Sequence, residues 1–469
     1  MIKSSQIFKN ISLAFIANII GLIASSIITF VLPKFIGVTQ YSYYQLYIFY
    51  VSYIGFLGFG WLDGLYLRYG GKYFNKINKN LLSAEFRYFS LFEIFLAFVV
   101  LLYTLLSFPG TNKFIIYCSV ALCIFIYMPR ALLHNLLLTS GQINEYATTL
   151  IIENIIKVSL VICGIFIGEM SFFWFVCSDL IGRFIASLYV YYVCRKLIFV
   201  KMCKFSIILN EIIANIKCGL FLMLSNIASM LIIGVVRQFI EIAWNIETFG
   251  KISLTLALSN FILIFINSIA MVLFPIIKRC NKENLAGIYN NIRTILMVLI
   301  LFILIFYEPL KSVFSIWLPQ YSDSLKYMAI LFPLCVFECK MNLLINTYYK
   351  SERKERLLLL INSVSLVLSI FISLLTCIIY KNLDLAVFSI IFSIGFRCIL
   401  AEFILSKFIK INVLKNTILE LILVGLFIYL SWYMAGLRSV LIYLFAYIIY
   451  IFMKKSDILS VIMLIRKKC

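Results

Sequence analysis

Nine of the charged residues that lie inside long apolar stretches of the sequence are candidate functional residues. The bases are Arg130, Lys157, Arg183, Lys340 and Arg397, and the acids are Glu153, Asp179, Glu338 and Glu402. A charge is costly inside a lipid bilayer, so such residues usually face other protein groups or a water-filled cavity. Arginine donates paired hydrogen bonds to phosphate groups, and embedded carboxylates bind protons or sodium ions. These residue types therefore indicate recognition of a phosphate-bearing ligand or binding of a cation.

Two of the acids have a base four residues further along the chain. Glu153 precedes Lys157, and Asp179 precedes Arg183. Residues at this spacing are neighbours on one helix face, so each pair is predicted to form an ion pair. The functional alternative is that Lys157 and Arg183 bind substrate and that the two acids bind a coupling cation.

The other three bases lack an acid at a suitable spacing. Arg130 has none within a helical turn. Lys340 is two residues from Glu338, and Arg397 is five residues from Glu402. We therefore interpret these three bases as substrate-binding residues of a cavity. A neutralising partner on a neighbouring helix is the alternative for each of them.

A dense group of tyrosines lies between residues 41 and 53. Tyr43, Tyr47 and Tyr50 have helical spacing on one face. Aromatic faces that carry hydroxyl groups are suitable platforms for sugars, so Tyr43 and Tyr47 are candidate substrate contacts. Ordinary packing at a membrane interface is the alternative.

The composition excludes most soluble protein classes. Hydrophobic residues make up 64% of the 469 residues, and charged residues make up 13%, about half the usual share. A soluble chain of this length cannot bury so much apolar surface. The 13 cysteines form no C-x-x-C pair and His134 is the single histidine, so we expect no metal site, no cofactor and no disulfide framework. The net charge of +21 is better explained by basic loops at a membrane than by nucleic-acid binding.

The fold class predicted is an all-α polytopic membrane protein. A spanning helix needs about 20 mainly apolar residues. Fourteen segments meet this requirement: 11–32, 42–65, 89–107, 114–138, 148–168, 172–194, 218–236, 252–276, 293–308, 327–349, 357–379, 384–406, 417–434 and 438–453.

The basic residues predict the orientation of these spans. Alternate loops carry 28 Lys and Arg residues on one side and eight on the other. The basic side of a membrane protein faces the cytoplasm, so both termini are predicted to be cytoplasmic. The first apolar run is too long for a cleaved signal peptide and lacks a small-residue cleavage site, so it should remain as a span.

A weak internal repeat, offset by 208 residues, suggests two lobes of equal topology. The stretch from Lys34 aligns with the stretch from Ile242, placing Tyr41 opposite Phe249. The predicted divisions are a six-helix lobe at 1–194, a basic cytoplasmic linker at 195–217, a second six-helix lobe at 218–406, and two added helices with a basic tail at 407–469. Parallel repeats of this kind predict a central cavity and alternating access.

The sequence from Leu32 to Tyr73 reads L-P-K-F-I-G-V-T-Q-Y-S-Y-Y-Q-L-Y-I-F-Y-V-S-Y-I-G-F-L-G-F-G-W-L-D-G-L-Y-L-R-Y-G-G-K-Y. This segment resembles the polysaccharide-biosynthesis flippases, including the O-antigen flippases. They belong to the multidrug/oligosaccharidyl-lipid/polysaccharide exporter superfamily. The run from Phe249 to Pro275 is also similar.

The resemblance implies a flippase, not an enzyme, in a bacterial inner membrane. It implies that an undecaprenyl-diphosphate-linked oligosaccharide, such as an O-antigen repeat unit, moves from the cytoplasmic to the periplasmic leaflet. It also implies a lipid-tail groove at the last two spans. The protein is expected to act as a monomer, and a polysaccharide polymerase and chain-length machinery are candidate partners. Asp63 and Arg68 fall in the matched segment, where substrate capture competes with a packing role.

Three other functions remain open. A cation-coupled multidrug exporter of the same superfamily would use Glu153 and Asp179. A peptidoglycan-precursor flippase differs only in substrate. A polysaccharide polymerase or ligase would need a large periplasmic loop, and the outside loops at 237–251 and 307–326 are short.

The predicted orientation can be tested with a reporter fused after Lys468. Because the basic residues keep their phase through all fourteen spans, we expect green fluorescent protein at this position to fluoresce and alkaline phosphatase to be inactive. The opposite pair of readings would contradict the topology.

Overall fold

The computed structural model describes residues 19–70, 77–200, 205–260, 285–352, 354–434 and 436–459, and these contain helices and no strand. The prediction of an all-α chain is confirmed. The chain divides into two compact units, Met1–Ile227 and Ala228–Cys469. The division falls inside one long helix, α10 (Phe205–Ala243).

The protein is a multi-pass membrane protein. Ten described helices are long and apolar enough to cross a membrane, or up to eleven if one bent pair counts as a span. Two shorter apolar helices cover Ile19–Phe35 and Leu437–Met453. Most of the predicted span at 252–276, the start of the span at 11–32 and the basic tail after residue 459 lie outside the described residues.

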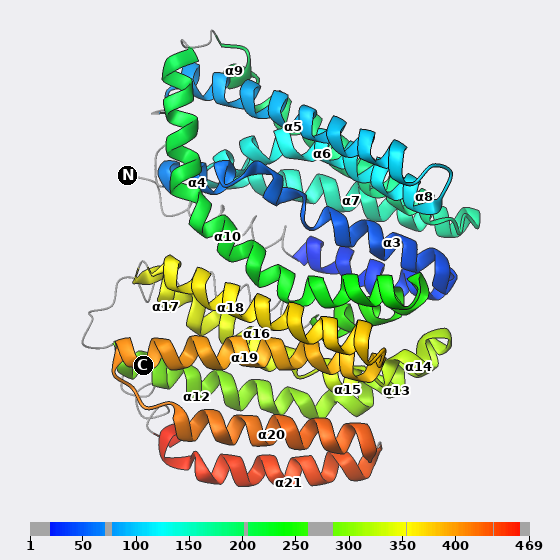
Figure 1. The fold of residues 1–469 in the computed structure, drawn as a ribbon, viewed down its shortest axis with the longest axis vertical. Coiled ribbons are helices and arrows are strands. Elements are labelled where there is room, and N and C mark those ends of the chain that lie inside the picture. Colours follow the sequence, from blue (N-terminus) through cyan, green and yellow to red (C-terminus); the bar gives the residue numbers. More distant parts are fainter. Residues whose placement is uncertain are drawn as a thin grey trace. The chain divides into compact units, whose positions relative to one another are not determined.

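Unit 1 is built around four long helices that lie alongside one another (Figure 1). They are α5 (Lys79–Ser107), α6 (Asn112–Thr139), α7 (Ile143–Ile167) and α8 (Phe172–Val193). Before them come η1 (Ile27–Val31), α2 (Leu32–Phe35), α3 (Val38–Val51), η2 (Ile54–Gly58) and α4 (Trp61–Tyr69), and after them α9 (Arg195–Ile198) and the first part of α10.

Side-chain caps explain where the long helices begin. Asn78, Thr111 and Ser171 each accept a hydrogen bond from a first-turn N–H group, at the starts of α5, α6 and α8. Gly168 ends α7 in the left-handed conformation, with φ of 82°. These short polar turns separate apolar runs, so the sequence locates the spans well.

The predicted span 42–65 is not one straight helix. Residues Val38–Gly58 and Trp61–Tyr69 form a pair of helices bent by 63°. Phe59 and Gly60 have φ of 47° and 82°, and this left-handed backbone ends one helix before the next begins. The apolar pattern alone cannot reveal the bend, because both halves remain apolar.

Glycines let the backbones of α4 and α10 touch within unit 1. A Cβ atom added at Gly64 would lie 1.8 Å from the carbonyl oxygen of Asn215. One added at Gly219 would lie 2.1 Å from the carbonyl oxygen of Gly60. Small residues of this kind allow close helix packing in membranes. Residues 205–217, predicted as part of a linker, are here the helical start of α10, which packs on α4.

Unit 2 contains a buried span, Met328–Ser351. Within an apolar stretch of 18 residues in this span, 89% of the residues are buried. The span is broken into short turns, and Pro333 and the π-helical turn η7 (Lys340–Ile345) account for its irregularity. The span consists of α15 (Met328–Leu331), α16 (Leu334–Cys339), η7 and α17 (Asn346–Ser351). The other described elements of unit 2 are the rest of α10, a helical segment at 246–260, α12 (Leu285–Ile303), η5 (Leu304–Phe306), α13 (Tyr307–Trp317), η6 (Pro319–Tyr321), α14 (Ser322–Leu325), α18 (Glu355–Ser373), η8 (Leu374–Ile379), α19 (Leu383–Ile409), α20 (Leu414–Tyr433) and α21 (Leu437–Met453).

The last two helices, α20 and α21, lie side by side (Figure 1). They pack against the rest of unit 2 through α12 and α15. The hydroxyl groups of Tyr443 and Tyr447 donate to the carbonyl oxygens of Leu301 and Val298, each over 2.9 Å. These bonds join α21 to α12.

The glycine contact generates a stability prediction. Gly64→Ala should lower the melting temperature of the purified protein, because the new methyl group would meet backbone atoms that cannot rotate away. We expect a loss of about 2 kcal/mol or more, measured by thermal unfolding in detergent.

Gly425→Ala is the matched control, because nothing lies within 4 Å of a Cβ atom at this exposed position of α20. It should be neutral or stabilise the helix by up to about 1 kcal/mol. Equal melting temperatures for the two variants would argue against the close contact of α4 and α10.

Candidate functional site

Five of the predicted site residues meet in unit 1. We call them cluster 1: Arg130 from α6, Glu153 and Lys157 from α7, and Asp179 and Arg183 from α8. The Nη2 atom of Arg130 lies 2.6 Å from Oε2 of Glu153. One carboxylate oxygen of Asp179 lies 2.9 Å from Nζ of Lys157, and the other lies 2.7 Å from Nε of Arg183. The five side chains therefore form two sets of ion pairs: Arg130 of α6 with Glu153 of α7, and Asp179 of α8 with Lys157 of α7 and Arg183 of α8.

The spacing of the charges predicted only part of this pattern. The pair Asp179–Arg183 is confirmed. The predicted pairing of Glu153 with Lys157 is wrong, because each of these two residues has a closer partner on a neighbouring helix. Arg130, which has no acid within a turn of its own helix, is neutralised by α7. Spacing along one helix cannot reveal partners on another.

A glycine brings α7 and α8 close enough for this pairing. A Cβ atom added at Gly182 would lie 2.9 Å from the carbonyl oxygen of Glu153 and 3.3 Å from Cβ of Lys157. The short side chain lets α8 approach α7 directly beside the charged residues. Asp179 and Arg183 flank Gly182 in the sequence, so the close contact and the ion pairs occur at the same level of the helices.

Cluster 1 contains three bases and two acids, so it carries one positive charge in excess. The guanidinium groups of Arg130 and Arg183 lie 4.9 and 5.0 Å from the ring centre of Tyr127. The electron-rich face of the ring attracts both cations. The hydroxyl group of Tyr47 donates to Asp179 over 2.9 Å. Two tyrosines thus hold the charged groups in place.

Arg183 is also exposed to a cavity in unit 1. This cavity has a volume of about 320 Å³, and its lining includes Ser52 and Gly55 from the α3–η2 break, together with Tyr127 and Arg183. Arg183 is its charged lining residue. The excess positive charge of cluster 1 therefore lies next to a space that can hold a small polar group.

The other candidates in the matched sequence segment lie apart from this cavity. Tyr47 is buried and contacts cluster 1, whereas the Tyr43 ring packs on Phe172 with 5.2 Å between ring centres. Neither tyrosine lines the cavity. The structure does not bring Tyr43 and Tyr47 together as an exposed sugar platform.

Arg68 belongs to a separate polar group that joins α4 to α10. Its guanidinium lies 2.9 Å from the carboxylate of Glu211 and donates to the side-chain oxygen of Asn215. Asn215 in turn donates to Glu85 of α5 over 2.9 Å. Asp63 lies in the first turn of α4. These contacts give Arg68 a role in packing, which was one of its two predicted alternatives.

Unit 2 holds a second buried group of charges, which we call cluster 2: Arg293 of α12, Lys340 of η7, Glu402 of α19 and Glu420 of α20. Arg293 lies 2.7 Å from Glu402 and 2.6 Å from Glu420. Lys340 lies 2.9 Å from Glu420 and also contacts Glu402. Two bases meet two acids, and each side chain is at most 5% exposed.

The remaining predicted base, Arg397, pairs with Glu338 over 2.5 Å and donates to the hydroxyl group of Ser229. The cavity beside Lys340 has a volume of about 10 Å³, room for a water molecule at most. Lys340 and Arg397 therefore join helices within unit 2.

Sequence reasoning missed several embedded charges. Arg293 was counted with a loop, and Glu420 was not considered, although both complete cluster 2. Glu93 of α5 is buried, and both of its carboxylate oxygens lack a hydrogen-bond partner among the described residues. The apolar residues on both sides of Glu93 were the signal that could have identified it.

Among the described residues, no group of three His, Cys, Asp or Glu side chains could hold a metal ion. The cysteines in the described part of the chain form no disulfide bonds.

Comparison with known proteins gives a fold. No protein-family model matches the chain, and no curated protein matches its sequence. A lipid II flippase, MurJ in an inward closed conformation, matches over 96% of this chain and 99% of its own, with a TM-score of 0.62 and 14% identity. The chain has the fold of a membrane transporter. An inward-facing multidrug resistance MATE transporter of the MOP superfamily matches over 84% of this chain and 98% of its own, with a TM-score of 0.57 and 14% identity. A MATE transporter in a straight conformation matches over 86% of this chain and 95% of its own, with a TM-score of 0.56 and 12% identity.

The shared carboxylate of cluster 1 generates a stability prediction. Asp179→Asn should destabilise the protein by about 3–5 kcal/mol, because Lys157 and Arg183 would both lose their buried counter-charge. Thermal unfolding in detergent measures the effect.

Asp384→Asn is the matched control, because Asp384 and its partner Lys326 are half exposed and 3.6 Å apart. An exposed pair of this kind contributes about 1 kcal/mol or less. A loss at Asp179 no larger than the loss at Asp384 would contradict the buried ion-pair network.

Proposed function

We propose that the protein is a transporter that moves an undecaprenyl-diphosphate-linked oligosaccharide between membrane leaflets. The substrate would be an O-antigen or other surface-polysaccharide repeat unit, and the direction would be from the cytoplasmic to the periplasmic leaflet by alternating access. The observation that carries this proposal is the excess positive charge of cluster 1 beside the cavity that Arg183 lines.

The chemistry of cluster 1 suits a diphosphate. Arg183 can offer its remaining N–H groups to phosphate oxygens while Nε stays bonded to Asp179. Lys157 and Arg183 share the single negative charge of Asp179, so the positive charge of Arg183 is only partly neutralised. A phosphate in the cavity would complete the charge balance, and the low dielectric of the surrounding helices would strengthen that attraction.

The fold comparisons support a transporter of the multidrug/oligosaccharidyl-lipid/polysaccharide exporter superfamily. MurJ, the neighbour with the longest coverage among those reported above, is named as a flippase of a lipid-linked molecule, lipid II. At 14% identity the likeness concerns the fold, so the substrate proposed here rests on cluster 1 and on the resemblance of the segment Leu32–Tyr73. A bacterial inner membrane, cytoplasmic termini, a monomeric state and a neighbouring polymerase belong to the same proposal.

A cation-coupled multidrug exporter is the second candidate, and Glu93 favours it. Glu153 and Asp179 are bound to bases and are poor sites for reversible cation binding. Glu93 is buried in a membrane span, and neither of its carboxylate oxygens is bonded within the described residues. A carboxyl group in this setting can gain and lose a proton during a transport cycle. The MATE folds among the structural neighbours agree with this alternative.

Deletion of the gene in the native bacterium tests the first proposal. We expect loss of the surface polysaccharide and accumulation of single polyprenyl-diphosphate-linked repeat units facing the cytoplasm. Complementation with Arg183→Gln should give at least about tenfold less surface polysaccharide than complementation with wild type, because a charged hydrogen bond to phosphate is lost.

Lys79→Gln is the control for complementation, because Lys79 is exposed at the start of α5. Membrane abundance of each variant is measured by immunoblot, so that folding defects are separated from transport defects. Intact surface polysaccharide together with new sensitivity to cationic dyes would instead indicate drug export, and Glu93→Gln would then be the variant expected to abolish it.

A further inference from the structure

A larger cavity, which the proposed transport does not use, lies at one end of unit 2. It has a volume of about 580 Å³ and is formed by the beginning of α12, the beginning of α20 and the end of α21. Most of its lining is polar, and half of the lining residues are four asparagines and two lysines: Asn290, Asn291, Asn412, Asn416, Lys415 and Lys454. In the predicted topology this end of the helices faces the cytoplasm.

Lys454 is the buried base of this cavity. Its side chain is 5% exposed, and its ammonium group lies 2.7 Å from the carboxylate of Asp457 and contacts the side-chain oxygen of Asn416. Asp457 is half exposed. Together with Lys415, the described lining holds two bases and one acid, an excess of one positive charge. Among the described residues Lys454 has one counter-charge, the half-exposed Asp457, and a buried lysine in this setting favours a further anion.

The start of α20 adds to this positive field. Helix α20 runs for 20 residues from Leu414, and Asn412 accepts the N–H group of Leu414 over 3.2 Å. The first N–H groups of a helix have no acceptor within the helix, and their dipoles attract anions. Lys415 and Asn416 lie in this first turn and also line the cavity. The helix end and the buried lysine therefore favour the same kind of ligand.

Apolar surface adjoins the polar cavity. Leu414, Ile418 and Ile422 of α20 are more than half exposed, as are Phe445 and Phe452 of α21. Leu419 and Met453 form apolar parts of the cavity lining itself. A ligand with a polar head and apolar tails would satisfy both surfaces, whereas a soluble anion would use only the cavity.

We propose that this cavity binds the phosphate headgroup of an anionic phospholipid. Lys454 and Lys415 bind the phosphate oxygens, and the asparagine amides bind headgroup hydroxyls, since an amide can both donate and accept hydrogen bonds. The acyl chains follow the exposed faces of α20 and α21. The bound lipid joins α12 to the last two helices, in addition to cluster 2 and the tyrosine bonds of α21. The bound phospholipid is distinct from the transported lipid, although the resemblance also implies a lipid-tail groove at these last two helices.

Native mass spectrometry and thermal unfolding of the purified full-length protein test the site. The probes are a phosphatidylglycerol, a phosphatidylcholine of the same acyl chains, and glycerol 3-phosphate. We expect wild-type protein to retain one phosphatidylglycerol at least about tenfold more tightly than phosphatidylcholine, with a rise in melting temperature that glycerol 3-phosphate does not cause. Lys454→Gln should reduce this affinity by about tenfold or more.

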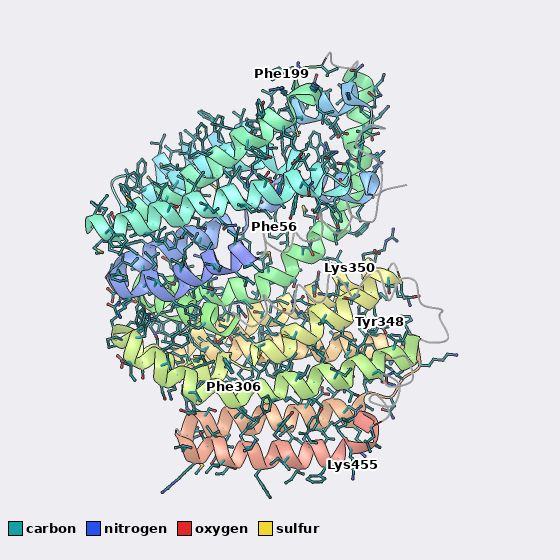
Figure 2. All side chains as sticks on the ribbon, turned by 180° about the vertical axis from the view of Figure 1, so that it is seen from behind. Phe56, Phe199, Phe306, Tyr348, Lys350 and Lys455 are labelled. Atoms are coloured by element: carbon teal, nitrogen blue, oxygen red, sulfur yellow. The ribbon has the colours of Figure 1, made fainter. Side chains whose placement is uncertain are left out.

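Lys455→Gln is the matched control, because Lys455 is the adjacent, exposed residue at the end of α21 (Figure 2) and does not line the cavity. Lys415→Gln is a second variant that should fold, because Lys415 is exposed, and it should weaken binding in the same direction as Lys454→Gln. Equal binding of the two lipids by wild type, or equal affinity of Lys454→Gln and Lys455→Gln for phosphatidylglycerol, would overturn the proposal. If glycerol 3-phosphate raised the melting temperature as much as phosphatidylglycerol does, the cavity would be a site for a soluble phosphate. That result would also overturn the proposal that it binds a lipid.

Discussion

Charges buried among apolar helices must be neutralised inside the protein, and this constraint governs both units. A lone charge in the bilayer interior costs several kcal/mol. In each cluster, ion pairs between different helices offset this cost. The pairs also fix which helices are neighbours, since an apolar helix surface in lipid has little hydrophobic preference for one neighbour over another. Charge pairing therefore contributes to the arrangement of the helices as well as to chemistry.

The two clusters meet this constraint differently. Cluster 2 is balanced and enclosed, and it binds α20 to the body of unit 2 through Glu420. Cluster 1 keeps one base in excess and presents Arg183 to a cavity. A closed, neutral cluster favours a structural role, and an open, positive cluster favours anion binding. The proposed binding of a lipid-linked diphosphate therefore depends on the excess positive charge of cluster 1.

Backbone irregularities lie close to the polar groups in both units. In unit 1 the chain bends at Phe59 and Gly60, and the cavity that Arg183 lines is formed in part by the preceding α3–η2 break. In unit 2 the π-helical turn η7 begins at Lys340, a member of cluster 2. Such turns redirect side chains and leave backbone groups for other partners. Polar sites and irregular backbone therefore occur together in these helices.

The sequence by itself determined that the chain is all-α, that it crosses a membrane many times, and that many of its embedded charges need an explanation. Apolar length and the cost of unpaired charge are local properties that a sequence displays directly. Only the tertiary structure decided the partners: Arg130 with Glu153, Lys157 with Asp179, and Arg397 with Glu338. Helical spacing reports neighbours on one helix, whereas all three of these pairs join different helices. The bend at Phe59 was equally hidden, because a left-handed residue in an apolar run leaves no mark on hydropathy.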